Sequence, residues 1–200
     1  MESFPAFFPL AGRRVVIVGS GEHAEGKARL FQGSPAELVR VDDGRGLDPE
    51  TYRGAALAFI ASGDAAFDQM AADAAREAGV PVNVVDRTEL CDFFTPALVD
   101  RGQVVAAVGT GGASPVLAQV LKQELEGAIP EGAGRLAALL QEFRKAMQAA
   151  YPDMQARRRF VMGVLGGPAA EAAMEGRMDE ARRILKDELA NRPPSVSPPG

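Results

Sequence analysis

The segment VVIVGSGEHAEGKARL, residues 15–30, constrains the fold more than any other part of the sequence. Its branched apolar run predicts a buried strand, and the glycines after it predict a tight turn into a helix. Gly19, Gly21 and Ala24 have the spacing G-x-G-x-x-A. In a dinucleotide site the first glycine permits the turn, the second lets the backbone approach a pyrophosphate, and the third small residue lets helix and strand pack closely. The alternative is a turn with a purely structural role.

A second signal for a dinucleotide lies at the end of the next predicted strand. Asp42 follows the glycines by about twenty residues, where a carboxylate accepts hydrogen bonds from both ribose hydroxyls and repels a 2′-phosphate. We therefore predict NAD as the cofactor, with Asp43 as the alternative ribose contact. The competing interpretation is that both aspartates only begin the polar loop DDGRG. The residues predicted to bind the cofactor are Gly19, Ser20, Gly21, Glu22, His23, Ala24, Asp42, Asp43 and Ser62.

The rest of the first half predicts an α/β fold with a Rossmann-type parallel sheet, because short apolar runs alternate with helical patterns. Strands are predicted at 15–18, 37–41, 56–60 and 82–85, helices around 22–31 and 65–78, and a further extended run at 103–108. Only about fourteen residues separate Asp42 from the next strand, too few for the helix and edge strand usual at this place. The sheet is therefore expected to lack an edge strand.

After the turn GTGG the pattern becomes helical. Ser114 is predicted to cap a helix that begins at Pro115, with Leu117, Leu121 and Leu125 on one face. Two later apolar stripes predict further helices: Leu136, Leu139, Leu140, Phe143 and Met147, and then Met178, Ala181, Ile184, Leu185 and Leu189. The last residues, NRPPSVSPPG, have no apolar pattern and predict a disordered tail.

Composition narrows the classes of partner. The net charge of -5 and the lack of a long basic stripe argue against nucleic acid. The single cysteine excludes an intrachain disulfide and fits a reducing cytoplasm. No run approaches the roughly 18 apolar residues of a membrane span, and no secretory signal is apparent. With one histidine and no nearby ligands, no metal site is predicted. We predict a cytoplasmic protein without nucleic-acid or membrane partners.

Three sequence blocks carry a resemblance to a known family. The opening FPAFFPLAGR, the strand ending in NVVD, and the turn and helix GTGGASPVLA occur in this order before a later RRRF. They resemble the precorrin-2 dehydrogenase family, the N-terminal dehydrogenase and ferrochelatase half of sirohaem synthase. The resemblance implies NAD-dependent oxidation of precorrin-2 to sirohydrochlorin, in sirohaem biosynthesis, by a homodimer. Two alternatives stay open: a bifunctional enzyme that also inserts ferrous ion, and a protein that binds NAD or a tetrapyrrole without turnover.

The same resemblance assigns catalysis to Asp86, the aspartate of the NVVD motif. Oxidation of precorrin-2 removes a proton from the macrocycle as well as a hydride, so a positioned carboxylate can serve as the general base. Metal insertion also requires protons to leave the pyrrole N–H groups, and the same carboxylate can accept them. Without the family, an aspartate that caps the turn DRTE is the simpler interpretation.

The substrate is an octacarboxylate, so cationic and N–H-rich groups are expected around it. The predicted substrate residues are Thr110, Gly111, Gly112, Ser114, Arg157 and Arg158, with Arg101 as a further candidate. Helix starts attract anions, and guanidinium groups bind carboxylates in bidentate fashion. The alternatives are a turn that only connects domains and a solvated basic helix face. Relatives carry two serines before the paired glycines, where this sequence has Gly109 and Thr110.

These predictions divide the chain into four parts. Residues 1–95 form the NAD-binding domain, 96–128 the dimerisation segment, 129–190 a helical domain and 191–200 the tail. The dimerisation segment follows from the resemblance, and the apolar face of its predicted helix agrees with it.

Overall fold

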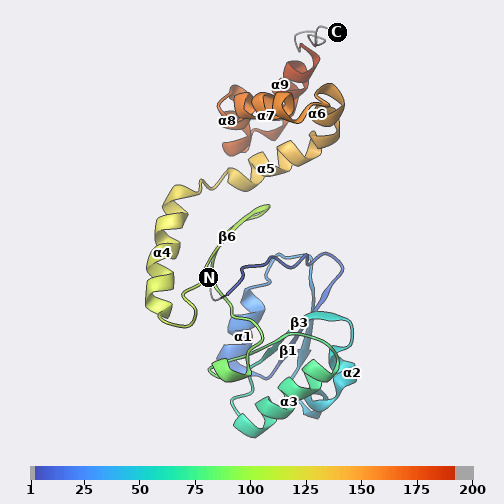
Figure 1. The fold of residues 1–200 in the computed structure, drawn as a ribbon, viewed down its shortest axis with the longest axis vertical. Helices are drawn as coiled ribbons and strands as arrows, with labels where there is room; N and C mark the ends of the chain where they lie inside the picture. Colours follow the sequence, from blue (N-terminus) through green and yellow to red (C-terminus); the bar gives the residue numbers. More distant parts are fainter. Residues whose placement is uncertain (1–2, 192–200) are drawn as a thin grey trace. The chain divides into compact units, whose positions relative to one another are not determined.

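The computed structural model describes residues 3–191 of the chain, which form two compact units (Figure 1). The first unit comprises Met1–Pro96 and Gly109–Pro115, and the second comprises Ala97–Val108 and Val116–Gly200. The predicted tail, 191–200, lies outside the described residues except for Asn191. Among the described helices, none combines the length and the apolar character that a membrane crossing requires.

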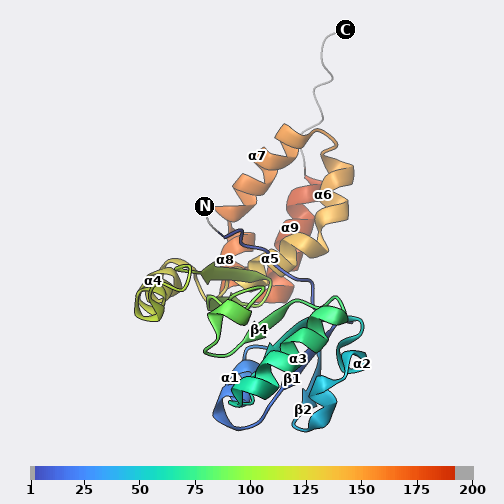
Figure 2. The ribbon, with the colours of Figure 1, turned by 60° about the horizontal axis from the view of Figure 1, so that its bottom comes forward.

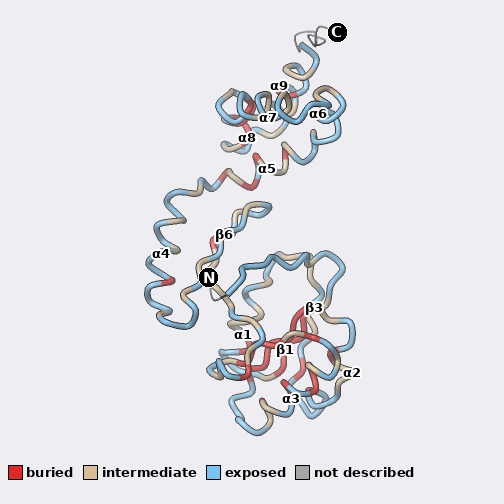
Figure 3. The backbone as a smooth tube through the Cα atoms, viewed as in Figure 1, coloured by how far each residue is buried: buried red, intermediate tan, exposed pale blue. Residues whose placement is uncertain are grey.

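The first unit is built on a four-stranded parallel sheet with the order β2-β1-β3-β4. The strands are β1 (Arg14–Val18), β2 (Glu37–Val41), β3 (Ala55–Ile60) and β4 (Val82–Val84). They confirm the four strands predicted for the sheet and its parallel arrangement. The central strands β1 and β3 are almost wholly buried (Figure 3), as expected when helices cover both faces of a parallel sheet.

Two helices cover opposite faces of this sheet, α1 (Gly21–Arg29) and α3 (Ala65–Glu77), as Figure 1 shows. Alternate residues of β1 point to opposite faces, since side chains in a strand alternate. Val16 and Val18 belong to the core with the alanines of α3, whereas Val15 and Ile17 belong to the core with Ala24 of α1. The predicted helices and the helix-facing role of Ala24 are confirmed.

The segment after β2 confirms one expectation and corrects another. No described strand lies beyond β2, which is the edge of the sheet, as predicted. The expectation that this segment has no room for a helix was wrong, because two single-turn helices fit: η1 (Gly44–Leu47) and α2 (Pro49–Tyr52). The carboxylates of Asp43 and Asp48 cap them, and the buried Tyr52 hydroxyl donates a hydrogen bond of 2.6 Å to the Gly46 carbonyl.

The second unit begins with an antiparallel hairpin of β5 (Ala97–Arg101) and β6 (Val104–Val108). The extended run predicted at 103–108 is confirmed, but β5 was missed because no turn signal other than Gly102 separates the two strands. Gly102 has φ +75, which suits a tight hairpin turn. A long helix, α4 (Pro115–Ala128), begins at the predicted proline.

Five helices complete this unit: α5 (Ala133–Glu142), α6 (Arg144–Ala150), α7 (Met154–Leu165), α8 (Pro168–Met174) and α9 (Met178–Ala190). The alanine-rich α8 packs against α5, α7 and α9 (Figure 2). Its alanines join Leu136, Leu139, Val164 and Leu185 in one core. Both predicted apolar stripes therefore face the interior, the first of them spread over α5 and α6.

Candidate dinucleotide site

A pocket of about 330 Å³ lies at the carboxyl ends of β1, β2 and β3. In open parallel sheets this is the edge where ligands bind. The residues that line it are Val18, Gly19, Ser20, Asp42, Asp43, Gly44, Ser62, Asp64 and Phe67. The structure thus brings together five of the predicted cofactor residues, from three segments of the chain: Gly19, Ser20, Asp42, Asp43 and Ser62. Sequence reasoning missed Asp64, the N-cap residue of α3, and Phe67, in the first turn of that helix.

The first glycine of the motif is held against β3. Gly19 has φ +115, and a Cβ at this position would lie 2.3 Å from the Ala61 carbonyl oxygen. Its N–H donates a 2.8 Å hydrogen bond to the Val41 carbonyl, which ties the turn to β2. Gly21 also has a positive φ, +77, but a Cβ there would meet nothing within 4 Å. The space above Gly21 is open, as a backbone cradle for a pyrophosphate requires.

Helix α1 begins at this turn and presents its N-terminus at the pocket. Ser20 is the N-cap residue and makes no side-chain capping bond. The N–H groups of the first helical turn have no acceptor within the helix, so they suit a phosphate group. Glu22 and His23 are exposed on this turn, whereas Ala24 is fully buried against the sheet.

The two aspartates after β2, Asp42 and Asp43, differ in the hydrogen bonds and ion pairs that their carboxylates make. Asp43 accepts a hydrogen bond from the Arg45 N–H at 2.9 Å and pairs with the Arg45 guanidinium at 3.0 Å. The hydrogen bond from Arg45 holds the pKa of Asp43 below its usual value. Within residues 3–191, no hydrogen bond or ion pair engages the Asp42 carboxylate. Asp42 is therefore the available acceptor for a ribose, and Asp43 caps η1.

Ser62 organises the part of the pocket lining that follows β3. Its hydroxyl donates a 2.6 Å hydrogen bond to the buried carboxylate of Asp68 and accepts one from the Asp64 N–H at 3.1 Å. Asp64 in turn caps α3 by accepting from the N–H groups of Ala66 and Phe67. Ser62 thus shapes the pocket lining, and its hydroxyl already donates one hydrogen bond and accepts another within the protein.

Asp86 follows β4 at the same edge of the sheet and has an unusual backbone. It has φ +58, a positive value shared with no other non-glycine residue that the structure describes. Aspartate tolerates this conformation better than most residues, yet it still costs energy. Strained backbone of this kind gathers at functional sites. The Asp86 side chain is exposed, although Asp86 does not line the pocket itself.

Lys27 of α1 is a neighbour of this region that sequence reasoning missed. Its Nζ lies 3.2 Å from the Thr95 hydroxyl and 5.4 Å from the centre of the Phe59 ring. Burial lowers the pKa of Lys27, and the nearby Cys91 and Asp86 act in the opposite direction. Lys27 therefore places a positive charge within electrostatic reach of Asp86. A lysine inside the helix predicted to bind the cofactor, one turn beyond Ala24, was the available sequence signal.

The turn predicted to bind substrate is held by hydrogen bonds between its own residues. The Thr110 hydroxyl accepts a 3.2 Å hydrogen bond from the Ser114 N–H and donates one of 3.1 Å to the Ser114 carbonyl. Gly111 and Gly112 both have positive φ and face open space. Arg101, the further candidate, is engaged elsewhere: its mostly buried side chain pairs with Glu131 at 2.9 Å, which ties the hairpin to the segment between α4 and α5.

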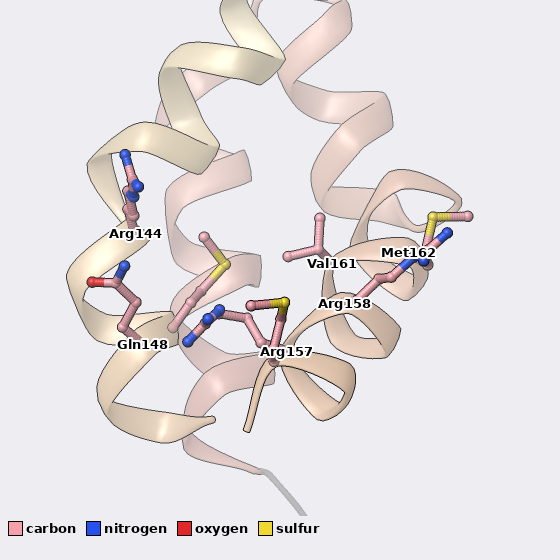
Figure 4. A pocket seen from close by; sticks show the side chains of 8 residues that line it. Arg144, Gln148, Arg157, Arg158, Val161 and Met162 are labelled. Carbon is pink, nitrogen blue, oxygen red and sulfur yellow. The ribbon is translucent and has the colours of Figure 1, made fainter. Parts of the chain in front are cut away.

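Two predicted substrate residues lie in a second pocket, of about 360 Å³, within the helical unit (Figure 4). Arg157 and Arg158 of α7 line it together with Arg144 of α6, which was missed. The other lining residues are Met147, Gln148, Met154, Val161 and Met162. Elsewhere, the described part of the chain contains no group of three or more His, Cys, Asp or Glu side chains placed to hold a metal ion.

The parallel sheet, the glycine turn and the available Asp42 define a Rossmann-type dinucleotide-binding protein. Comparison with known families agrees: an NAD(P)-binding model matches residues 6–97, and the sirohaem synthase dimerisation region matches 132–189. The chain is 40% identical over 214 aligned residues to siroheme synthase of Stutzerimonas stutzeri (strain A1501), covering 98% of this chain and 46% of that protein. It is also 40% identical to siroheme synthase of Methylococcus capsulatus, covering 92% of this chain and 43% of that protein.

These matches confirm the family that the sequence blocks indicate: the chain is a relative of sirohaem synthase. It spans about half the length of the curated relatives it matches. Among solved structures, the precorrin-2 dehydrogenase SirC superposes with a TM-score of 0.73 at 17% identity, covering 94% of this chain and all of SirC. This likeness confirms the fold. The dimerisation match begins after the segment predicted to mediate dimerisation, 96–128, which stays a prediction.

Proposed function

We propose that this protein oxidises precorrin-2 to sirohydrochlorin with NAD, in the biosynthesis of sirohaem. The observation that carries the proposal is the pocket at the edge of the sheet, with its glycine turn and its unengaged Asp42, in a chain 40% identical to sirohaem synthases. Such a pocket serves a nicotinamide cofactor, and the relatives indicate the substrate class.

The residues of the pocket fit NAD. Gly19 permits the tight turn against β3, Gly21 leaves the backbone open to the pyrophosphate, and Asp42 accepts hydrogen bonds from the ribose hydroxyls. The two arginines nearest to Asp42 are both engaged: Arg40 with Glu25 on α1, and Arg45 with Asp43. Neither guanidinium is free for a 2′-phosphate, so NAD is favoured over NADP.

Asp86 supplies the acid–base chemistry in this proposal. NAD, when bound, supplies the hydride acceptor. The Asp86 carboxylate, exposed at the end of β4, takes the proton that leaves the macrocycle. Lys27 provides positive charge near that carboxylate. The turn with Thr110, Gly111, Gly112 and Ser114 is proposed to meet substrate carboxylates through the N–H groups of Gly111 and Gly112, because the Ser114 N–H already donates to the Thr110 hydroxyl.

A homodimer is the proposed assembly. Helix α4 exposes four large apolar side chains, Val116, Leu117, Val120 and Leu121, of which Val116 is 74% exposed. Contiguous apolar surface of this kind marks an interaction site. The match to a dimerisation region agrees with association of two copies. The single cysteine fits a cytoplasmic location.

Anaerobic incubation with precorrin-2 and NAD tests the proposal. We expect NADH absorbance to rise together with the spectrum of sirohydrochlorin, in equal amounts. Binding of NAD without turnover would contradict the proposal and favour a non-catalytic binding protein. Addition of ferrous or cobaltous ion to the product then tests for the chelatase alternative, in which the same carboxylate accepts the pyrrole protons.

A further inference from the structure

The segment that forms α6 and α7 has a charge opposite to that of the whole chain. Residues 143–170 contain four arginines and one lysine but a single acidic residue, Asp153, whereas the protein as a whole has a net charge of -5. Asp153 is used as the N-cap of α7, where its carboxylate accepts from the N–H groups of Gln155 and Ala156. The positive charge of this segment is therefore not neutralised from within it.

The arginines of the basic pocket also lack acidic partners from the rest of the helical unit. Arg177 and Arg182, in the same unit, form ion pairs with Glu175 and Glu142. By contrast, no described acidic group lies within ion-pair distance of Arg144, Arg157 or Arg158. Three guanidinium groups without acidic partners therefore border one pocket, and an anionic ligand would neutralise their charge.

The same pocket has an apolar lining. Among the residues that line it, Met147 is buried, Val161 is half-buried, and Met154 and Met162 are 76% and 61% exposed. Exposed methionines are costly to leave in water, and their flexible thioethers adapt to the outline of a bound group. A ligand with both an apolar body and negative charges matches this combination.

The cations are spread around the pocket and do not converge on one point. In Figure 4, Arg157 extends toward Gln148 of α6, while Arg158 extends the other way beside Met162, with Val161 between them. Arg144 lies one helical turn from Gln148. The backbone of Tyr151 holds Arg157, whose guanidinium donates a 3.1 Å hydrogen bond to its carbonyl. Such separation suits several carboxylates on a broad ligand better than one small anion.

We propose that this pocket of the helical unit binds a polycarboxylate with a broad apolar body, with Arg144, Arg157 and Arg158 each contacting a separate carboxylate. The identification of that ligand as a tetrapyrrole rests on the proposed function. Guanidinium groups bind carboxylates in bidentate fashion, and the methionines and Val161 contact the apolar body.

Uroporphyrin III, an octacarboxylate that undergoes no dehydrogenation, is the probe for this site. Its binding to the full chain is measured by fluorescence quenching for the unmutated protein, for Arg144→Gln with Arg158→Gln, and for Arg183→Gln. Arg183 is the matched control, an exposed arginine of α9 outside the pocket. We expect at least a tenfold loss of affinity in the double variant and no change in the control. Etioporphyrin, which lacks carboxylates, should not bind.

Three results would overturn the proposal. The first is equal affinity of the double variant and the unmutated protein for uroporphyrin. The second is displacement of the porphyrin by an equal concentration of inorganic phosphate, which indicates a general anion site. The third is a dimer that dissociates in the double variant, which assigns the pocket to contact with a second copy. If the double variant does not fold, Arg144→Lys with Arg158→Lys and the salt dependence of binding provide the same comparison.

The test separates this proposal from the proposed function. Uroporphyrin binding that depends on the arginines, in a protein that leaves precorrin-2 unoxidised, would support the pocket and contradict the enzyme. Oxidation of precorrin-2 with unchanged KM in the double variant would support the enzyme and contradict the pocket. NADH binding, followed by cofactor fluorescence, should be the same in all these variants.

Discussion

Gly19 lies directly against the backbone of Ala61, where a Cβ on Gly19 would be 2.3 Å from the carbonyl oxygen. The obstacle is the backbone of a central, buried strand end, which side-chain rotation cannot remove. The glycine is thus required by the packing of β1 against β3, in addition to its role in the turn.

We expect Gly19→Ala to lower the free energy of unfolding by about 2–4 kcal/mol, since it combines overpacking with the cost of a positive φ. Gly12→Ala is the matched control, because Gly12 has φ +69 but faces open space. That variant should lose only about 1–2 kcal/mol. Urea unfolding of both variants measures the difference, and equal losses would contradict the steric argument.

The carboxylate of Asp42 should decide cofactor choice. Asp42→Ala is expected to lower the affinity for NAD about tenfold or more, as loss of charged hydrogen bonds does. It should also reduce the preference for NAD over NADP. Asp43→Asn should weaken NAD less, since Asp43 is already held by Arg45. Titrations followed by NADH and NADPH fluorescence make the comparison. Equal affinity of the unmutated protein for both cofactors would refute the role of Asp42.

Asp86 should separate chemistry from cofactor binding. Asp86→Asn keeps the shape and the tolerance of a positive φ but cannot take a proton, so turnover should fall on the order of 10² to 10⁴-fold with unchanged NAD affinity. Gly21→Val should instead abolish NAD binding, because its side chain enters the open space of the pyrophosphate cradle. Stopped-flow absorbance at the NADH band measures both. An Asp86→Asn variant that loses NAD binding would show a structural role.

Tyr52 should make stability depend on alkaline pH. Burial raises the pKa of its hydroxyl, so the folded state keeps a proton that the unfolded chain loses near its ordinary pKa of about 10. The stabilisation is fully present below that pH and is lost as the pH rises toward the folded pKa. Tyr52→Phe should cost about 1–3 kcal/mol at pH 8, since it leaves the buried Gly46 carbonyl without its donor. Unfolding curves between pH 8 and 11 should show that the difference in free energy of unfolding between the unmutated protein and Tyr52→Phe decreases as the pH rises. A difference that stays constant would contradict this.

The apolar face of α4 should hold two copies together. Leu117→Glu with Leu121→Glu is expected to convert a dimer into a monomer, because both side chains are exposed within one chain and would be buried against a second. Gln119→Glu with Gln123→Glu adds the same charge to polar positions of that helix. Sedimentation at micromolar concentration distinguishes the species. A monomeric unmutated protein would overturn the prediction.

Local patterns predicted the sheet and much of the pocket, because strands such as 15–18 and the glycine turn are set by neighbours in sequence. They missed β5, whose residues ALVDR alternate weakly and gain their strand character only by pairing with β6. They missed Lys27 and Phe67, whose importance depends on which distant strand ends the fold brings near. The choice between Asp42 and Asp43 required knowledge of the partner of each carboxylate.

The Gly109–Pro115 segment makes the first unit discontinuous in sequence. The polypeptide leaves the dinucleotide-binding unit after Pro96, returns to it at Gly109 and leaves again after Pro115. A cut or a crossover at residue 96 would therefore remove a part of the first unit that is encoded downstream of the hairpin. Recombination between related genes at residue 96 therefore cannot exchange one unit intact. Both units would have to come from the same parent gene.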